Sequence, residues 1–144
     1  MQITRQAEYA LRTVLFLTKQ EPNQRISTSR IAKEKKIPNS FLAKIISQLS
    51  IAGLIHTSRG AHGGVSLSKP TEKISMLDVV EAIDGPVTLN ECVAHPDECE
   101  FGVDCPLHEV WCKSQAELVE NLRTAHFDKF VKSNHNDRCT IKGE

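Results

Sequence analysis

The fold is decided by the stretch STSRIAKEKKIPNSFLAKIISQLSIAG, which covers residues 27–53. Ser27 or Thr28 can cap a first short helix, because a hydroxyl side chain at that position accepts a backbone N–H. A tight connection then leads to a second helix, which Gly53 closes as a typical C-cap. That second helix buries an apolar stripe made of Leu42, Ile45, Ile46 and Leu49. Two short helices joined by a few residues predict a helix-turn-helix.

The flanking segments extend this helix pair into a larger unit. Upstream, apolar residues recur at three-and-four spacing over residues 4–19, which predicts a first helix with Thr4 as its N-cap. Downstream, residues 54–59 and 65–68 read as two short strands around a glycine-rich tip at residues 60–64. Three helices followed by a glycine-tipped hairpin are the element order of a winged helix.

The formal net charge of zero hides a strong asymmetry along the chain. Residues 1–73 carry 12 Lys and Arg against 4 Asp and Glu, a charge of +8, whereas residues 74–144 carry 6 against 14, a charge of −8. A basic half suits a polyanion, because neutralising phosphates releases counterions and supplies most non-specific affinity. Since every element of the predicted winged helix lies in the basic half, double-stranded DNA is the expected partner.

Individual residues of this half can be assigned to DNA contacts. In a helix-turn-helix the first turn of the second helix enters the major groove, although Asn39 or Ser40 alone could instead be a helix cap. In the hairpin, Arg59 suits a narrow minor groove, and Gly63 lets the backbone approach a phosphate without a Cβ clash. The predicted DNA-binding residues are Thr28, Asn39, Ser40, Lys44, Ser47, Arg59, His62 and Gly63. The cations expected to position the domain on the sugar-phosphate backbone are Arg5, Arg30, Lys33, Lys35 and Lys36.

The second half of the chain predicts two further helices around a cysteine-rich loop. Ser75 can cap a fourth helix that ends at Gly85, and a long helix then runs from Pro106 to about Thr124. Because helices gain stability chiefly from packing, the apolar side of the long helix is most simply buried against its copy in a second subunit. The alternative is packing against the first helix of the same chain. This apolar side consists of Leu107, Val110, Trp111, Leu118, Leu122 and Ala125.

The expected fold class is mainly α with a small β-hairpin, a winged helix-turn-helix followed by a long C-terminal dimerisation helix. Residues 1–73 would form the DNA-binding domain, and residues 74–132 the fourth helix, the cysteine loop and the dimerisation helix. Residues 133–144 are polar and lack periodicity, so we expect a disordered tail there. The expected assembly is a homodimer.

The sequence also argues against other classes of protein. No apolar run approaches the roughly 20 residues that span a bilayer, and the N-terminus lacks the residue succession of a secretory signal. We therefore expect a soluble, cytoplasmic protein with no membrane partner. No nucleophile paired with a base, phosphate-binding loop or carboxylate dyad stands out, so we do not expect an enzyme.

Three of the five cysteines lie in the pattern Cys92-x6-Cys99-x5-Cys105-x2-His108. In a reducing compartment such a group indicates metal ligation or redox chemistry more often than disulfides. The loop around it could not build a core, so thiolate-metal bonds would explain why it is ordered. The spacing is looser than the paired cysteines of zinc fingers. It therefore favours an iron-sulfur centre over zinc, a thiol redox switch or unliganded cysteines.

The sequence resembles the Rrf-type winged-helix transcriptional regulators over nearly its whole length, to about Val131. The resemblance implies a homodimer joined by the long C-terminal helix, an iron-sulfur cluster at the dimer edge, and control of promoters by the state of that cluster. The residues that carry it are Glu8-Tyr9-Ala10-Leu11, Leu49 with Ala52-Gly53-Leu54, Arg59-Gly60, Gly63-Gly64-Val65-Ser66-Leu67, Asp78-Val79-Val80 with Asp84, and Cys92, Cys99, Cys105, His108 and Trp111.

Members of this family differ in the fourth cluster ligand, which is either a histidine three residues after the third cysteine or an acidic residue in the first helix of the partner chain. The resemblance therefore offers His108, which favours [2Fe-2S], and Glu8, which suits [4Fe-4S]. We favour His108 and [2Fe-2S]. Of the two remaining cysteines, we expect Cys112 to be a packed thiol and Cys139 to be inert.

The function that follows is a sequence-specific DNA-binding transcriptional regulator, in the first instance a repressor. Its promoter affinity would be controlled by an iron-sulfur cluster that senses redox state, nitric oxide or iron-sulfur status. One alternative is a cluster-free regulator of the same fold, switched by thiol oxidation or by a protein partner. Another is an electron-transfer or cluster-carrier protein, in which the wing and the basic half would have no purpose.

Overall fold

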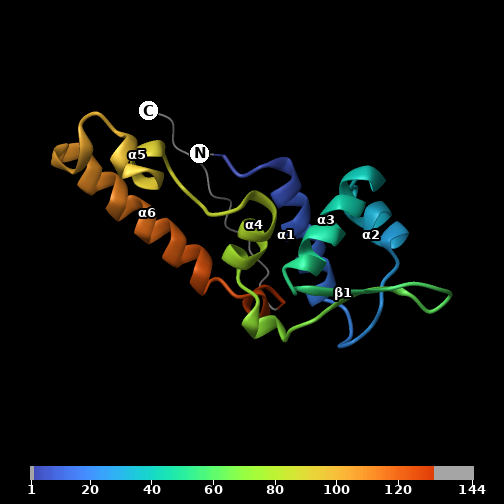
Figure 1. Ribbon diagram of the computed structural model, residues 1–144. Helices are drawn as coiled ribbons and strands as arrows, with labels where there is room; N and C mark the ends of the chain where they lie inside the picture. The colour runs from blue at the N-terminus through green and yellow to red at the C-terminus, as the bar shows by residue number, and fades with distance from the viewer. Residues whose placement is uncertain (1, 132–144) are drawn as a thin grey trace, which may run out of the picture.

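The computed structural model describes residues 2–131, in which three helices and a hairpin form a winged helix-turn-helix (Figure 1). The expected fold class, mainly helical with one small hairpin, is confirmed. The elements of this unit are α1 (Arg5–Thr18), α2 (Thr28–Lys35), α3 (Asn39–Ile51), β1 (Ile55–Ser58) and β2 (Gly64–Leu67).

Hydroxyl caps explain where the first two helices begin. The side chain of Thr4 accepts the backbone N–H of Ala7 at 3.2 Å, which confirms the predicted cap of α1. Of the two candidates before α2, Ser27 is the cap, since its hydroxyl accepts the N–H of Arg30 at 3.2 Å. Thr28 is thereby left as the first exposed residue of α2.

The helix α3 begins without a side-chain cap. Pro38 occupies the N-cap position, and the two residues that follow, Asn39 and Ser40, are exposed. Neither side chain caps the helix, so the alternative role that the sequence allowed for them is wrong. At the other end Ala52 is the C-cap, one residue earlier than expected, and Gly53 follows it with a φ of 74°.

The wing is a hairpin with a third, single-residue strand at its edge. β1 and β2 pair antiparallel, with Ile55 opposite Leu67. On the other side of β2, Ile26 and Val65 exchange two backbone hydrogen bonds of 2.9 and 2.8 Å. A Cβ on Gly64 would lie 2.8 Å from the carbonyl oxygen of Ile26, so this close approach requires glycine. The start of α2 and the wing are therefore held together.

The hydrophobic core of the winged helix extends into α4 (Met76–Asp84), which packs against α1 and α3. α4 begins with the predicted cap at Ser75, here a capping box in which Ser75 and Asp78 each accept the other's backbone N–H. At its other end, Asp84 accepts the backbone N–H and the hydroxyl of Thr4, the cap of α1. One core therefore joins the basic and the acidic half of the chain.

The long helix α6 (Pro106–Thr124) projects from this body as an arm, and its bounds match the prediction (Figure 1). Only its C-terminal part packs on the body, where Leu118, Val119 and Leu122 are half-buried against α4. Part of the apolar side that we expected to face a second subunit is thus covered by α4 of the same chain.

After α6 the chain turns back and locks the base of the arm to the body. The N–H of Met76 donates to the carbonyl of Ala125 at 2.9 Å, and the N–H of Phe127 donates to the carbonyl of Ile74 at 3.0 Å. Phe127 begins the short 3-10 helix η4 (Phe127–Phe130) and is buried in the main core. The C-terminal end of α6 is therefore fixed relative to α4.

The cysteine loop between α4 and α6 is folded into short helical turns. It lies at the far end of the arm, against the first turns of α6 (Figure 1). The turns of the loop are α5 (Glu91–Ala94), η2 (Pro96–Glu98) and η3 (Gly102–Asp104). One more 3-10 turn, η1 (Thr71–Lys73), lies outside the loop, before α4.

Two of our expectations concern parts of the chain that the structure does not describe. The predicted disordered tail, residues 133–144, lies outside the described residues, and so does Cys139.

Within residues 2–131, no helix is both long enough and apolar enough to cross a membrane.

Candidate functional site

A groove of about 520 Å³ runs between the start of α2, one face of α3 and the wing. It is lined by four of the predicted DNA-binding residues, which come from separate segments of the chain: Thr28, Ser47, Arg59 and Gly63. A second groove between α2 and α3 is lined by Thr28 and Asn39. The two grooves share Thr28 and Ala43, so the start of α2, the exposed face of α3 and the wing form one concave surface.

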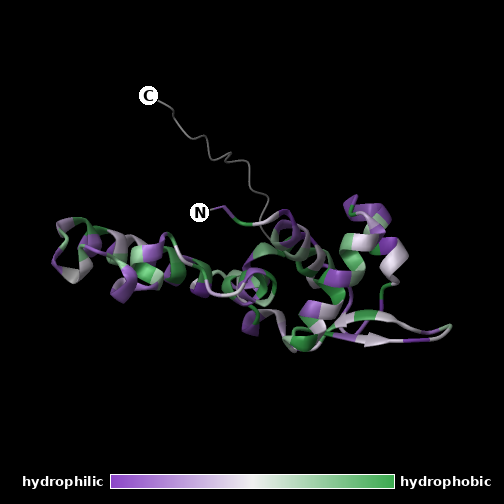
Figure 2. Cartoon of the chain, turned by 45° about the horizontal axis from the view of Figure 1, so that its top comes forward, coloured by the Kyte–Doolittle hydropathy of each residue, from purple (hydrophilic) through white to green (hydrophobic). Residues whose placement is uncertain are grey.

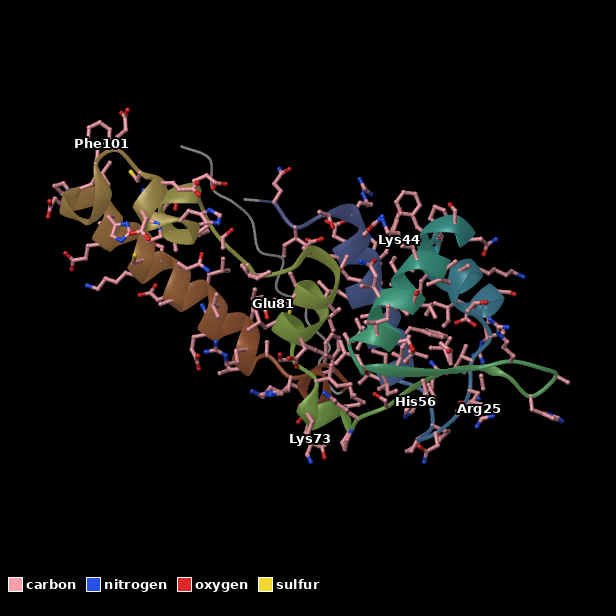
Figure 3. The ribbon with its side chains drawn as sticks, in the orientation of Figure 1. Arg25, Lys44, His56, Lys73, Glu81 and Phe101 are labelled. Atoms are coloured by element: carbon pink, nitrogen blue, oxygen red, sulfur yellow. The ribbon has the colours of Figure 1, made fainter. Side chains whose placement is uncertain are left out.

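The remaining predicted contacts, Ser40, Lys44 and His62, are exposed but line neither groove. Lys44 projects from α3, as Figure 3 shows. In the described part of the chain, neither Lys44 nor Arg59 forms an ion pair with an acidic side chain. Their charges are therefore available to a polyanion.

Several residues of the groove were not predicted from the sequence. One of them is Ile51, whose surface is 85% accessible although it is a large apolar residue. Its position off the stripe of buried α3 residues was the signal that could have identified it. The unpredicted lining residues include Ser50, Ile51, Thr57 and Ser58.

Some of the cations expected on the sugar-phosphate backbone are partly engaged within the chain. Arg30 pairs with Glu34 at 2.7 Å, and the ammonium of Lys35 lies 5.1 Å from the ring centre of Phe16. Lys33 is exposed on α2 and pairs with no acidic side chain of residues 2–131. The charge of Lys33 is thus more available for a phosphate contact than that of Arg30.

The cysteine loop and the start of α6 present four thiols, all free and all half-buried. Cys92 lies in α5, Cys99 follows η2, and Cys105 is the N-cap residue of α6. None of the residues of α5 or η2 is fully buried, so the loop has no apolar core of its own. The loop is positioned by contacts of α5 and η3 with α6.

His108 lies one turn into α6, and its ring contacts a cysteine that we had expected only to pack. Its Nε2 atom is 3.4 Å from the Sγ atom of Cys112, one turn further along the helix. Both residues are half-buried. Cys112 is therefore a neighbour of the candidate ligand and not an isolated thiol.

The other candidate ligand, Glu8, lies in the first turn of α1, exposed and 3.8 Å from Arg5. α1 lies within the body of the molecule, whereas the cysteine loop lies at the far end of the arm (Figure 1). Glu8 could therefore reach a cysteine loop only across an interface between two copies.

The donor set suits an iron-sulfur cluster by its chemistry, because three free thiols and an imidazole are ligands that such clusters use. Among residues 2–131, no three His, Cys, Asp or Glu side chains come close enough to hold a single metal ion. Residues 2–131 thus contain no preformed site for a single metal ion.

Comparison with known proteins gives the family context of this surface and this loop. The profile of the Rrf2 family, described as iron-dependent transcriptional regulators, matches residues 3–133. Protein aau3 of Rhizobium meliloti is 32% identical over 135 residues, which cover 92% of this chain and 86% of that protein.

Solved structures share the fold. The crystal structure of a candidate transcriptional regulator from Listeria innocua has a TM-score of 0.80 and 28% identity, covering 100% of this chain and 95% of that one. CymR, the global cysteine regulator of B. subtilis, has a TM-score of 0.77 and 23% identity, covering 91% of this chain and 96% of that one. The winged-helix architecture is thus common to these proteins and to this chain.

Proposed function

Since this chain belongs to the Rrf2 family of iron-dependent transcriptional regulators, we propose that it is a sequence-specific repressor that binds operator DNA as a homodimer under the control of an iron-sulfur cluster. The observation that carries the DNA-binding part is the concave surface between α2, α3 and the wing. It gathers predicted contact residues from three segments, and all of them lie in the basic half of the chain.

The shape of this surface suggests how DNA is bound. The first turns of α3 enter the major groove, where Asn39, Ser40 and Lys44 face base edges. Because neither Asn39 nor Ser40 caps the helix, both side chains are free to bond a base or a phosphate. The wing, with Arg59 at its shoulder, follows into the adjacent minor groove.

The exposed part of α6 supports the homodimer. Leu107, Val110 and Trp111 are 65%, 60% and 42% accessible, and their spacing places them on one face of α6. Hydrophobic residues, in green, occur along the projecting arm in Figure 2. Large apolar side chains grouped on one face of a helix indicate an interaction surface. A second copy of α6 would cover them, and a dimer would place two recognition helices on DNA about one helical turn apart.

For the cluster, we propose Cys92, Cys99 and Cys105 as ligands, with His108 as the fourth ligand and Glu8 of a second copy as the alternative. A bound cluster would supply redox activity and sensitivity to small oxidants through its iron. The protein itself contributes the connection between the cysteine loop and the DNA-binding unit. Cys92 belongs to α5, which packs on α6, and Cys105 is the N-cap residue of α6. The other end of α6 is fixed to α4, which packs on α1.

Two experiments test this proposal. Selection from a random DNA library should enrich one sequence with two half-sites, and a protein that enriches none would refute the DNA-binding part. Anaerobic reconstitution followed by native mass spectrometry should detect iron and sulfide in a stoichiometric ratio per dimer. Cys139→Ala is the control that should retain the cluster, and retention by Cys92→Ala or Cys105→Ala would refute the assigned ligands.

A second candidate is a cluster-free regulator of the same fold, switched by thiol oxidation or by a protein partner. It is favoured by the four free, half-buried thiols. The visible spectrum of anaerobically purified protein separates the two candidates, because thiolate-to-iron charge-transfer bands arise only with iron bound. A colourless protein whose DNA affinity changes on oxidation would support the second candidate.

A further inference from the structure

Arg25 lies outside the hairpin, yet the structure places it beside the tip of the wing. Its Nη1 atom donates to the carbonyl oxygen of His62 at 3.4 Å, across a sequence separation of 37 residues. Figure 3 shows Arg25 next to the strands, on the way to the hairpin tip. The side chain is exposed. Sequence patterns did not single it out, because the contact depends on tertiary pairing.

The backbone holds Arg25 in this place. The next residue, Ile26, is fully buried and is locked to Val65 of β2 by two backbone hydrogen bonds. β2 therefore lies between β1 on one side and the segment of Arg25 on the other. The shoulder residue Arg59 follows β1, so the two arginines lie at opposite edges of the wing.

The width of the wing suggests what these two edges contact. Adjacent strands are about 4.8 Å apart, so the outer edges of three strands are separated by roughly 10 Å. The minor groove of B-DNA is only about 6 Å wide and is walled by a sugar-phosphate backbone on each side. A wing with an arginine at each edge would therefore place Arg59 in the groove and Arg25 against the sugar-phosphate backbone of the opposite wall.

The charge of Arg25 is available for such a contact. In the described part of the chain it forms no ion pair with an acidic side chain. A guanidinium has five N–H donors in a planar fork that matches phosphate, and only one of those of Arg25 is used by the carbonyl of His62.

We propose that Arg25 is a DNA-binding residue of the wing, which holds the tip through His62 and binds a backbone phosphate on the wall of the minor groove opposite Arg59. The inference rests on the proposed DNA binding and is independent of the cluster. It extends the wing contact from the hairpin to a segment that precedes α2.

The test compares three variants on the DNA sequence that the wild-type protein selects from a random library. Arg25→Ala should lower the slope of log affinity against log salt by about 0.9 for each subunit, the contribution of one phosphate contact. Its deficit relative to wild type should therefore shrink by roughly threefold per subunit between 50 and 200 mM salt. Arg25→Lys should keep most of the slope, because it keeps the charge.

Lys73→Ala is the matched control, since Lys73 is an exposed cation of the same half that lies on η1, away from the tip of the wing (Figure 3). It should leave the slope unchanged. In a phosphate ethylation interference assay, one phosphate per half-site should no longer interfere with binding when it is ethylated. This loss is expected with Arg25→Ala only.

An Arg25→Ala protein with the wild-type salt slope and ethylation pattern overturns the inference, whether or not its affinity falls. An affinity loss without a change in slope would mean that Arg25 only positions the wing. Circular dichroism confirms that each variant is folded. A wild-type protein that selects no DNA refutes the proposed function instead, so the two failures are distinguishable.

Discussion

The Sγ atom of Cys112 and the Nε2 atom of His108 lie 3.4 Å apart on successive turns of α6. If His108 is a cluster ligand, this contact occupies Nε2 and leaves Nδ1 for iron. Groups that hold the second nitrogen of a ligating histidine orient its ring, and their loss typically lowers metal affinity by about 10-fold to 100-fold.

We therefore expect Cys112→Ala to weaken cluster binding by about 10-fold to 100-fold and to alter the visible spectrum of the cluster. Cys112→Ser should be milder, because a hydroxyl can still bond Nε2. Titration of reconstituted protein with an iron chelator measures both effects. An alanine variant that retains its cluster as wild type does would contradict the role of this contact.

Arg59→Ala tests direct reading of the DNA by the wing. We expect it to cost about 1–3 kcal/mol on the selected operator and less on random DNA, because a narrow minor groove depends on sequence. Fluorescence anisotropy on both DNAs measures the difference. Equal losses would reduce Arg59 to a phosphate contact.

Gly64→Ala tests the junction between the wing and α2. A Cβ there would lie 2.8 Å from the carbonyl oxygen of Ile26, and the φ of 150° is also strained for alanine. We expect the free energy of unfolding to fall by about 1–3 kcal/mol, measured with urea. Gly60→Ala is the control, because a Cβ at Gly60 meets no atom within 4 Å and only its φ of 100° opposes it. Equal losses for the two variants would contradict the close approach.

Val110→Glu tests the dimer surface. Since Val110 is 60% exposed in the single chain, the substitution should leave the fold intact. Burying an unpaired carboxylate in an interface costs several kcal/mol, so the dimer Kd should rise roughly 100-fold or more. Ala116→Glu adds the same charge at an exposed position on another side of α6 and should leave the dimer unchanged. Sedimentation velocity measures the dimer Kd of each variant. Equal effects of both variants would place the interface elsewhere.

The sequence predicts most of the helices because their ends carry local signals. Pro106 begins α6 and Ser75 caps α4, and both bounds follow from residue types at single positions. The same local rules could have linked His108 to Cys112, since residues four apart share a helix face.

Other features could not be predicted because they depend on contacts between distant segments. An apolar stripe on α6 predicts burial but not its partner, and α4 covers Leu118 while Leu107 stays exposed. The pairing of Ile26 with Val65 involves a single residue, too short for any strand pattern. The place of Arg25 beside the wing follows from that pairing.

The central claim is that the cysteine loop controls DNA binding at the other end of the molecule. The proposed route runs from the loop through α6 to α4 and α1, elements that are packed on one another in succession. A bound cluster would fix the start of α6 and thereby the spacing of two recognition helices in a dimer. A coupling of about 1–3 kcal/mol is enough to change operator affinity roughly 5-fold to 150-fold.

The most direct measurement compares the cluster-loaded wild-type protein with the variant in which Cys92, Cys99 and Cys105 are all alanine. Both are assayed anaerobically on every operator that the wild type selects, with Cys139→Ala as the control. We expect the triple variant to differ from wild type by roughly 5-fold to 150-fold on at least one class of operator, and Cys139→Ala to match wild type. Equal affinities of the triple variant and the wild type on all operators would contradict the claim.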